Sequence, residues 1–232
     1  MIDVRPAEQR GHADYGWLDT WHTFSFNDYY DRRHMGFRTL RVINDDRIRP
    51  GQGFGLHPHR DMEIITYVLE GSLRHKDSLG NGSIIEAGDV QMMSAGNGVM
   101  HSEFNPSQSD PVHLLQIWIL PDTRGGVPTY AQRKLTRGEK LGGFKLIASP
   151  DGRDGSFKIK QNANVYAAII EKDKSITLPV QAGRHGWLHV AVGQVQLDTQ
   201  TLSAGDGAAL SVEQGIKLTG LTESEVLLFD LS

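Results

Sequence analysis

Cysteine is absent from the 232 residues of this chain. Its absence excludes disulfide bonds, thiolate zinc sites and iron–sulfur clusters together. A metal site in this chain must therefore be built from the nitrogen and oxygen ligands that His, Asp and Glu supply.

Excess positive charge and long apolar runs are also missing. The formal net charge is −4 and the sequence pI is about 6.2, so the composition offers no basic face of the kind that binds nucleic acid or anionic lipid. The densest apolar segment, LLQIWIL at 114–120, is too short to cross a bilayer, and the first residues lack the apolar core of a signal peptide. We expect a cytoplasmic protein with no nucleic-acid or membrane partner.

Glycine, in contrast, is abundant, with 26 residues. Short alternating or apolar runs of about five to eight residues are separated by glycine-containing turns, and no long segment has the apolar period of a helix. The turn LGNG at 79–82 lies between two such runs and predicts a hairpin. These patterns favour an all-β protein of the sandwich or barrel class.

A change in composition predicts two domains. Residues 121–143 are rich in glycine, proline and charge, which is typical of a linker. We place an N-terminal domain at 1–132 and a C-terminal domain at 133–232. A weak internal repeat supports two copies of one β-unit, because YVLEG (67–71) is similar to HVAVG (189–193) and both segments are followed by an AGD turn.

Two pairs of ligand-type residues predict a metal site. Side chains at i and i+2 of a strand point to the same face, so His57 and His59 face one side, and so do His101 and Glu103. A lone His-x-His is more often a solvated pair, but a second pair after a glycine-rich turn favours a metal site. Imidazoles and a carboxylate suit Fe(II), Ni(II), Cu(II), Mn(II) or Zn(II). Glu63, also close in sequence to His59, is a rival carboxylate.

Two sequence boxes carry a family resemblance. GQGFGLHPHRDMEIITYVLEG resembles the first motif of the cupins and GDVQMMSAGNGVMHSEFN resembles the second. More narrowly, these boxes and the segment PTYAQ resemble the pirin family, and WHTFSFNDYYD and RVINDD resemble its bacterial branch, which includes quercetin-cleaving members. The resemblance is specific over residues 1 to about 135 and looser beyond them.

The resemblance implies a bicupin, with two antiparallel, jelly-roll-like β-barrel domains packed face to face and a metal ion only in the N-terminal one. The implied ligands are His57, His59, His101 and Glu103. The chain departs from the general cupin pattern at Glu63, which follows the second histidine after three residues instead of the commoner four, and at Ser94, where proline is usual. We prefer Glu103 as the carboxylate ligand, and we expect Glu63 on the strand wall or behind the ligands. One divalent ion per chain is expected, Fe(II) first, with Ni, Cu, Mn, Zn or Co as alternatives.

The internal repeat allows the second domain to be tested for the same ligands. Aligning the two copies places Pro179, Gln181 and Leu218 where His57, His59 and His101 stand. None of these side chains offers an imidazole, so we expect no metal in the C-terminal domain.

The activity that the resemblance implies is that of a quercetin 2,3-dioxygenase. Such an enzyme opens the heterocycle of a flavonol with O2 and releases carbon monoxide, and Glu103 would act as the general base. The alternative is a metal-binding regulatory or interaction protein of the pirin type with no physiological flavonol turnover. A cupin isomerase is a third hypothesis. We expect a monomer.

Several other residues are weaker candidates. His22, His34, Asp45 and Asp46 are placed near the barrel mouth, where we favour structural roles. His75 and His113 lie on predicted strands, where they can face solvent, and His185 and His189 are interpreted as structural. The tryptophans are expected in packing, although aromatic residues near the mouth can also stack on a flat substrate: Trp17, Trp21, Trp118 and Trp187.

Overall fold

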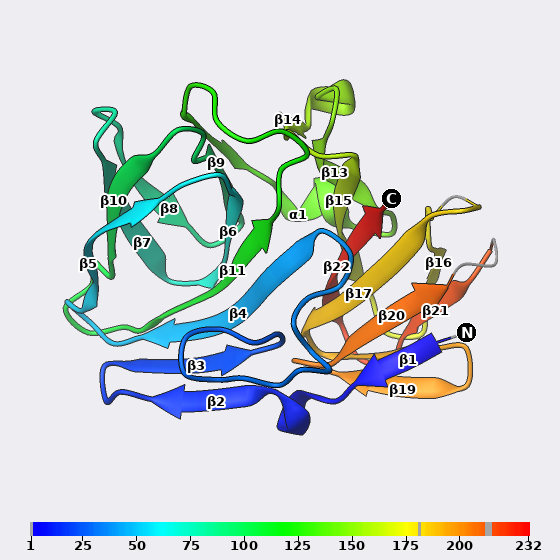
Figure 1. Cartoon of the computed structure of the whole chain (residues 1–232). Coiled ribbons are helices and arrows are strands. Elements are labelled where there is room, and N and C mark those ends of the chain that lie inside the picture. The colour runs from blue at the N-terminus through cyan, green and yellow to red at the C-terminus, as the bar shows by residue number, and fades with distance from the viewer. Residues whose placement is uncertain (1, 181, 212–214) are drawn as a thin grey trace. The chain divides into compact units, whose positions relative to one another are not determined.

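The computed structural model describes residues 2–180, 182–211 and 215–232, and this part of the chain is nearly all β-structure (Figure 1). Its helical elements are short: η1 (Ala7–Gln9), α1 (Arg137–Lys140) and η2 (Arg153–Gly155). The chain divides into two compact units. The N-terminal unit comprises residues 11–36 and 40–135, and the C-terminal unit comprises 1–10, 37–39 and 136–232.

The N-terminal unit consists of two antiparallel sheets. The larger has the order β12-β9-β6-β11-β4-β3-β2 and the smaller has the order β5-β10-β7-β8. The strands of the larger sheet are β2 (Gly11–Asp14), β3 (Leu18–His22), β4 (Leu40–Ile48), β6 (Glu63–Glu70), β9 (Asp89–Ser94), β11 (Val112–Ile119) and β12 (Thr129–Lys134). Those of the smaller sheet are β5 (Gly53–His59), β7 (Ser72–Asp77), β8 (Gly82–Glu86) and β10 (Val99–Phe104).

The C-terminal unit has the same construction. Its larger sheet has the order β1-β20-β17-β22-β15-β13-β14 and its smaller sheet has the order β16-β21-β18-β19. The strands of the larger sheet are β1 (Ile2–Arg5), β13 (Lys145–Ser149), β14 (Phe157–Lys158), β15 (Ala163–Ile170), β17 (His185–Val192), β20 (Gly207–Ser211) and β22 (Ser224–Leu231). Those of the smaller sheet are β16 (Ser175–Thr177), β18 (Gln194–Leu197), β19 (Gln200–Ser203) and β21 (Lys217–Gly220).

Matching strand orders confirm the internal repeat. The run β9-β6-β11-β4 in one unit corresponds to β20-β17-β22-β15 in the other, and β5-β10-β7-β8 corresponds to β16-β21-β18-β19. The glycines that mark the repeat occupy equivalent turns with left-handed backbone, at φ 73° for Gly71 and φ 81° for Gly193. Only glycine adopts this conformation without strain, which explains why the two sequence copies share it. The fold is therefore all-β with two cupin units, as the sequence predicts.

The observed division differs in detail from the predicted one. The predicted boundary lies between residues 132 and 133, whereas the structural division falls between 135 and 136. Strand β1 pairs with β20, so the first residues add an edge strand to the C-terminal unit. The segment 121–143, predicted as a linker, contains β12 and α1, and β12 pairs with β9. The hairpin predicted at 79–82 is confirmed, because β7 and β8 pair on either side of it.

Two apolar clusters fill much of the space between the sheets of the N-terminal unit. One includes Val68 and Leu114, and the other includes Ile64 and Met93. Thr66 lies between Ile64 and Val68 among the alternate residues of β6. The core of this unit therefore has a polar layer at the level of Thr66, between its two apolar clusters.

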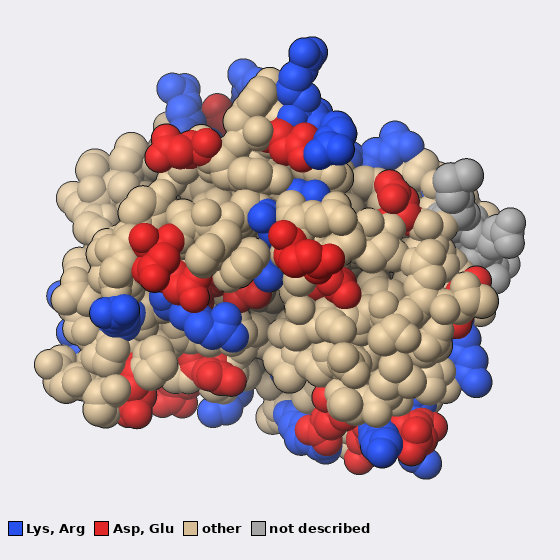
Figure 2. All heavy atoms as spheres, turned by 90° about the horizontal axis from the view of Figure 1, so that it is seen from below, with Lys and Arg blue, Asp and Glu red and all other residues tan. Residues whose placement is uncertain are grey.

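Surface charge follows the composition. Basic and acidic side chains are interspersed on the face that Figure 2 shows. None of the helices in the described ranges has the length and apolar character needed to span a bilayer.

Candidate metal centre

Three histidines converge on the inner face of the smaller sheet. His57 and His59 alternate with exposed residues on β5, and His101 lies directly opposite His57 on β10. The ring centroids are 4.4 Å apart for His57 and His101, 4.7 Å for His59 and His101, and 4.9 Å for His57 and His59. One ring nitrogen from each histidine lies within 4.8 Å of the others, a spacing that allows a shared cation.

The local sequence explains how the strands present these side chains. Strand β5 lies at the edge of its sheet, where Pro58 is tolerated between the two histidines. The chain reaches β10 through a turn in which Gly96 has φ 46° and Gly98 has φ 140°. A side chain at Gly96 would collide with the backbone, because its Cβ would lie 2.3 Å from the Gly126 carbonyl oxygen. The glycine-rich segment before His101 therefore allows a close turn that sets the register of β10.

The three imidazoles are suited to bind a metal ion. Burial, reinforced by the neighbouring histidines, lowers the pKa of His59 to about 4 and that of His101 to about 2. Both rings are therefore neutral at pH 7 and have a nitrogen lone pair available. His57 Nδ1 donates to the Gly55 carbonyl oxygen at 2.8 Å, which leaves its Nε2 as the ligand atom. His101 Nε2 is buried and has no hydrogen-bond partner, as expected of an atom whose partner is a metal ion.

Glu103 lies deeper in the same unit. It is 2% exposed, and its Oε2 accepts a hydrogen bond from Gln116 Nε2 at 3.1 Å. Burial raises its pKa to about 7. One of its oxygens falls within 4.8 Å of ligand atoms of His101 and His75, so Glu103 belongs to a second group that shares His101 with the first. The structure thus brings all three histidines together and places Glu103 beside His101, while the group with His57 and His59 does not extend to it.

The rival carboxylate, Glu63, belongs to neither group. It is 1% exposed on β6, directly opposite Ser94 on β9. Ser94 Oγ donates to Glu63 Oε1 at 2.6 Å. The two departures from the cupin pattern therefore meet in one buried hydrogen bond on the strand wall.

A cavity of about 480 Å³ opens on His57, His59 and Glu103. Aromatic side chains contribute to its wall, among them Phe26, Phe54 and Trp118. Trp118 packs edge-on against His59, with ring centroids 4.9 Å apart. The volume lies within the range of small-molecule sites, and the aromatic wall suits a flat apolar ligand.

A row of polar residues crosses the larger sheet beneath this cavity. Asn44, Gln116, Thr66 and Gln91 lie opposite one another on β4, β11, β6 and β9. Residues opposite one another in antiparallel strands point to the same face, so the row forms one polar stripe. Thr66 Oγ1 donates to Gln116 Oε1 at 3.1 Å, and Gln116 in turn holds Glu103. The stripe is thus the support for the carboxylate.

The structure corrects the expected environment of two histidines. His75 and His113 were predicted on strands, which is confirmed, but the expectation that they face solvent is wrong, because they are 0% and 6% exposed. His113 Nε2 pairs with Asp45 Oδ1 at 2.7 Å. His75 lies next to His101 and Glu103, and sequence reasoning missed this position. Its signal was His75-x-Asp77, the same i, i+2 spacing as in the two ligand pairs.

Of the remaining candidates, Asp46 and His22 belong to the cavity or its support, and His34 does not. Asp46 lines the cavity, and burial raises its pKa to about 7. His22 Nδ1 is 2.8 Å from Asn44 Oδ1, so it supports a residue of the cavity wall. His34 Nε2 lies 4.0 Å from Asp31 Oδ2, and His34 does not line the cavity.

In the C-terminal unit, apolar packing occupies the equivalent place. Leu218 on β21 is buried opposite Ile176 on β16, and both belong to one apolar cluster. Since His101 lies opposite His57, the register places Ile176, and not the aligned Pro179, where His57 stands. Gln181, the residue aligned with His59, lies outside the described residues. The two groups of potential ligands found among the described residues both lie in the N-terminal unit.

Comparison with known families identifies both halves of the chain. The model of the family Pirin matches residues 3–119, and the model of the quercetinase C-terminal cupin domain matches residues 146–231. The chain belongs to the pirin family. The predicted resemblance is thereby confirmed, and it extends through the second domain.

Close relatives of this pirin-family chain come from bacteria. Over 231 residues it is 50% identical to the quercetin 2,3-dioxygenase of Escherichia coli K12, covering 100% of this chain and 99% of that protein. It is 41% identical over 231 residues to a pirin-like protein of Caulobacter vibrioides, covering 99% of each. The crystal structure of the bacterial pirin YhhW from Escherichia coli in complex with nickel(II) is similar over 100% of this chain and 99% of that one, with a TM-score of 0.94 and 50% identity.

Proposed function

We propose that this pirin-family protein is a metal-dependent dioxygenase that cleaves a flavonol such as quercetin, with His57, His59, His101 and Glu103 as the metal ligands. The observation that carries the proposal is the cavity of about 480 Å³, which has an aromatic wall and is lined by Glu103 and by His57 and His59, two of the three clustered histidines. The names of relatives support it, since one at 50% identity is a quercetin 2,3-dioxygenase. The nickel(II) complex of YhhW supports a divalent ion.

The residues of the site divide the work of binding. Phe26, Phe54 and Trp118 would contact the faces and edges of a flat polyphenol, while Asn44 and Asp46 offer polar contacts for its hydroxyl groups. A flat ligand packed against these side chains would displace water from that side of the reacting ring. A divalent ion, when bound, supplies Lewis acidity that lowers the pKa of a coordinated hydroxyl, and redox chemistry as well if the ion is iron or copper.

Glu103 is the proposed proton acceptor. It lines the cavity beside His57 and His59, and Gln116 Nε2 donates to its Oε2 from behind, while Thr66 Oγ1 in turn donates to Gln116. A carboxylate fixed in this way can receive the proton of the substrate 3-hydroxyl. The resulting electron-rich enolate would react with O2, and the heterocycle would open with loss of carbon monoxide. Fe(II) is the ion that we propose first, and Ni(II) is the leading alternative.

The activity predicts an oxygen requirement that can be measured directly. Protein loaded with Fe(II) or with Ni(II) should bleach the flavonol absorbance of quercetin in air, should not bleach it under argon, and should release carbon monoxide. His57→Ala, which removes one imidazole, should lose both metal and turnover while keeping the circular dichroism of a β-protein. An intact metal complement without oxygen-dependent loss of quercetin would reject the dioxygenase and favour the metal-binding interaction protein.

A further inference from the structure

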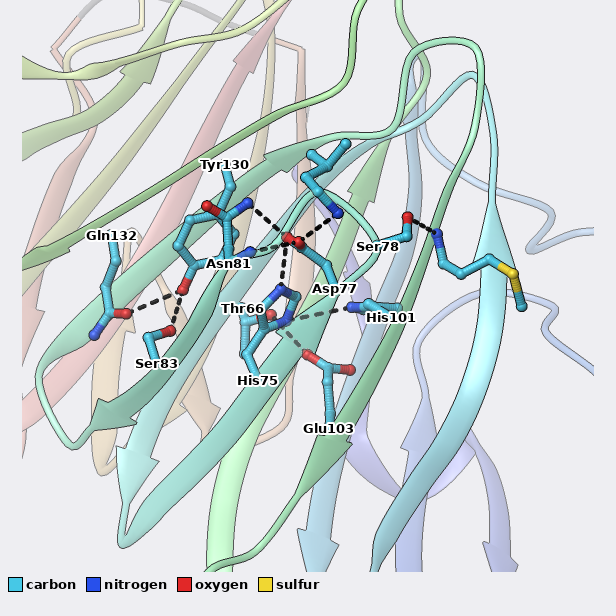
Figure 3. A network of polar contacts seen from close by, with 12 residues as sticks. Thr66, His75, Asp77, Ser78, Asn81, Ser83, His101, Glu103, Tyr130 and Gln132 are labelled. Atoms are coloured by element: carbon cyan, nitrogen blue, oxygen red, sulfur yellow. Dashed lines mark hydrogen bonds and ion pairs between the residues drawn. The ribbon is translucent and has the colours of Figure 1, made fainter.

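His75 connects the metal centre to a network on the smaller sheet (Figure 3). It lies on β7, opposite Glu103 of β10, and its side chain is completely buried. Its Nδ1 is 3.4 Å from His101 Nδ1, and its Nε2 is 3.2 Å from Asp77 Oδ2. Asp77, His75 and His101 thus form a chain of side chains that ends at a proposed ligand.

The proton positions along this chain follow from its far end. Asp77 accepts backbone N–H groups of Leu79 and Asn81 at 2.9 and 3.0 Å, and the Asn81 side-chain amide at 2.8 Å. Both oxygens of Asp77 thus accept from N–H donors, as those of an ionised carboxylate do. An ionised carboxylate can only accept, so the proton of His75 must be on Nε2. A neutral imidazole carries one proton, which leaves His75 Nδ1 as an acceptor.

The same reasoning fixes the tautomer of His101. Since His75 Nδ1 accepts, His101 Nδ1 must donate, and the lone pair of His101 is then on Nε2. His101 Nε2 is the buried atom that lacks a hydrogen-bond partner. Metal-binding histidines usually donate their second ring N–H to an acceptor that fixes tautomer and orientation.

We propose that His75, oriented by Asp77, is a positioning residue that accepts the His101 Nδ1–H and so presents His101 Nε2 to the metal ion. The inference rests on the ligand assignment of the proposed function. Tyr130 stacks on the other side of His75, with ring centroids 4.8 Å apart and an interplanar angle of 26°, and restricts the rotation of the ring.

A competing arrangement would make His75 itself a ligand. His75, His101 and Glu103 satisfy the same 4.8 Å spacing as the three-histidine group. An ion bound there through His101 Nδ1 would leave His101 Nε2 buried without a partner, which is unfavourable for a polar group. In the proposed arrangement, called the relay below, His101 Nδ1 donates to His75 and His101 Nε2 binds the metal ion. Both nitrogens of His101 then have a partner, so the relay is preferred.

Three variants test the relay by metal affinity. His75→Phe removes the acceptor but keeps a ring beside Tyr130, and we expect Ni(II) binding, measured by chelator competition, to weaken about 10–100-fold. His75→Asn keeps an acceptor near the position of Nδ1 and should recover part of this loss. His113→Phe is the matched control, because it also removes a buried histidine paired with an aspartate, and it should bind Ni(II) like the unchanged protein. Equal affinity of the His75→Phe and His113→Phe variants would overturn the proposal.

A spectroscopic measurement on the unchanged protein shows which ring nitrogen of His101 binds the metal ion, even if His75→Phe does not fold. In ¹⁵N-labelled protein loaded with ¹¹³Cd(II), we expect coupling of cadmium to Nε2 of His101, a protonated Nδ1 on the same ring, and no coupling to His75. Coupling to His101 Nδ1 or to His75 would reject the relay. A protein that binds neither Ni(II) nor Cd(II) would reject the ligand assignment of the proposed function itself, which separates the two failures.

Discussion

At the scale of single residues, the site depends on buried polar side chains that hold one another. Burial of a carboxyl is costly unless hydrogen bonds compensate, and the buried carboxyl groups of Glu63 and Glu103 each accept such a bond. Glu63 Oε1 accepts a hydrogen bond from Ser94 Oγ at 2.6 Å, and Glu103 Oε2 accepts one from Gln116 Nε2 at 3.1 Å. The residue at position 94, serine in place of the usual proline, therefore matters because it supplies a hydroxyl to the carboxyl of Glu63.

Replacing Glu103 and Glu63 separately by glutamine should show which of them is the metal ligand. Glu103→Gln removes the carboxylate beside His101, and we expect Ni(II) affinity to fall by more than about 10-fold. Glu63→Gln keeps an oxygen that can accept from Ser94 and should change the affinity by less than about 3-fold. Chelator competition on both purified variants measures the difference. The reverse order would assign the carboxylate ligand to Glu63.

At the scale of elements, β6 and β11 each carry a polar side chain in the middle of an apolar run, and these two side chains meet. Thr66 and Gln116 interrupt apolar runs in β6 and β11, and the register places them opposite one another. Tight glycine turns maintain this register, because a slip of one residue would turn every side chain to the opposite face. The turn at Gly71, between β6 and β7, is sterically constrained, since a Cβ there would lie 2.7 Å from the Pro111 carbonyl oxygen.

Two glycine variants test the role of this turn. Gly71 and Gly80 both have left-handed backbone, at φ 73° and φ 91°, but nothing lies within 4 Å of a Cβ added at Gly80. Gly80→Ala should cost only the conformational strain of about 1–2 kcal/mol. Gly71→Ala adds a steric collision and should lower the free energy of unfolding by about 2–4 kcal/mol. Urea denaturation compares the two, and equal losses would show that the close approach at Gly71 is unimportant.

At the scale of the whole molecule, one strand order is used twice with different interiors. In the N-terminal unit His57 faces His101 between β5 and β10, whereas in the C-terminal unit Ile176 faces Leu218 between β16 and β21. The first pair is suited to a cation and the second to apolar packing. The two units thus share one strand order, while the equivalent cross-strand pair consists of two histidines in one unit and of two apolar residues in the other.

Metal binding should therefore stabilise one unit selectively. Ni(II) at 100 times its dissociation constant contributes about 2.7 kcal/mol to the state that binds it. We expect slower amide hydrogen exchange in peptides from β5 and β10 on adding Ni(II), and unchanged exchange in peptides from β16 and β21. Mass spectrometry of both sets in one sample provides the internal control. Equal protection of both sets would contradict a site confined to the N-terminal unit.

The sequence by itself determined the all-β class, the two-unit repeat and the family. Strand periodicity and glycine turns are local properties, so they can be read without knowledge of distant contacts. The pairing of His57 with His59, and of His101 with Glu103, could be predicted for the same reason, since residues two apart on a strand share a face.

Only the tertiary structure decided which residues from different strands meet. His75, interpreted from its strand as able to face solvent, is buried against His101, because β7 lies beside β10 in the sheet. The pairing of β1 with β20 likewise gives the first residues to the C-terminal unit. Both outcomes depend on strand order and register between segments far apart in the chain, which local periodicity does not encode. His57 and His59 form a candidate metal centre because the sheet places β10, with His101, beside β5 and places β7 on the other side of β10.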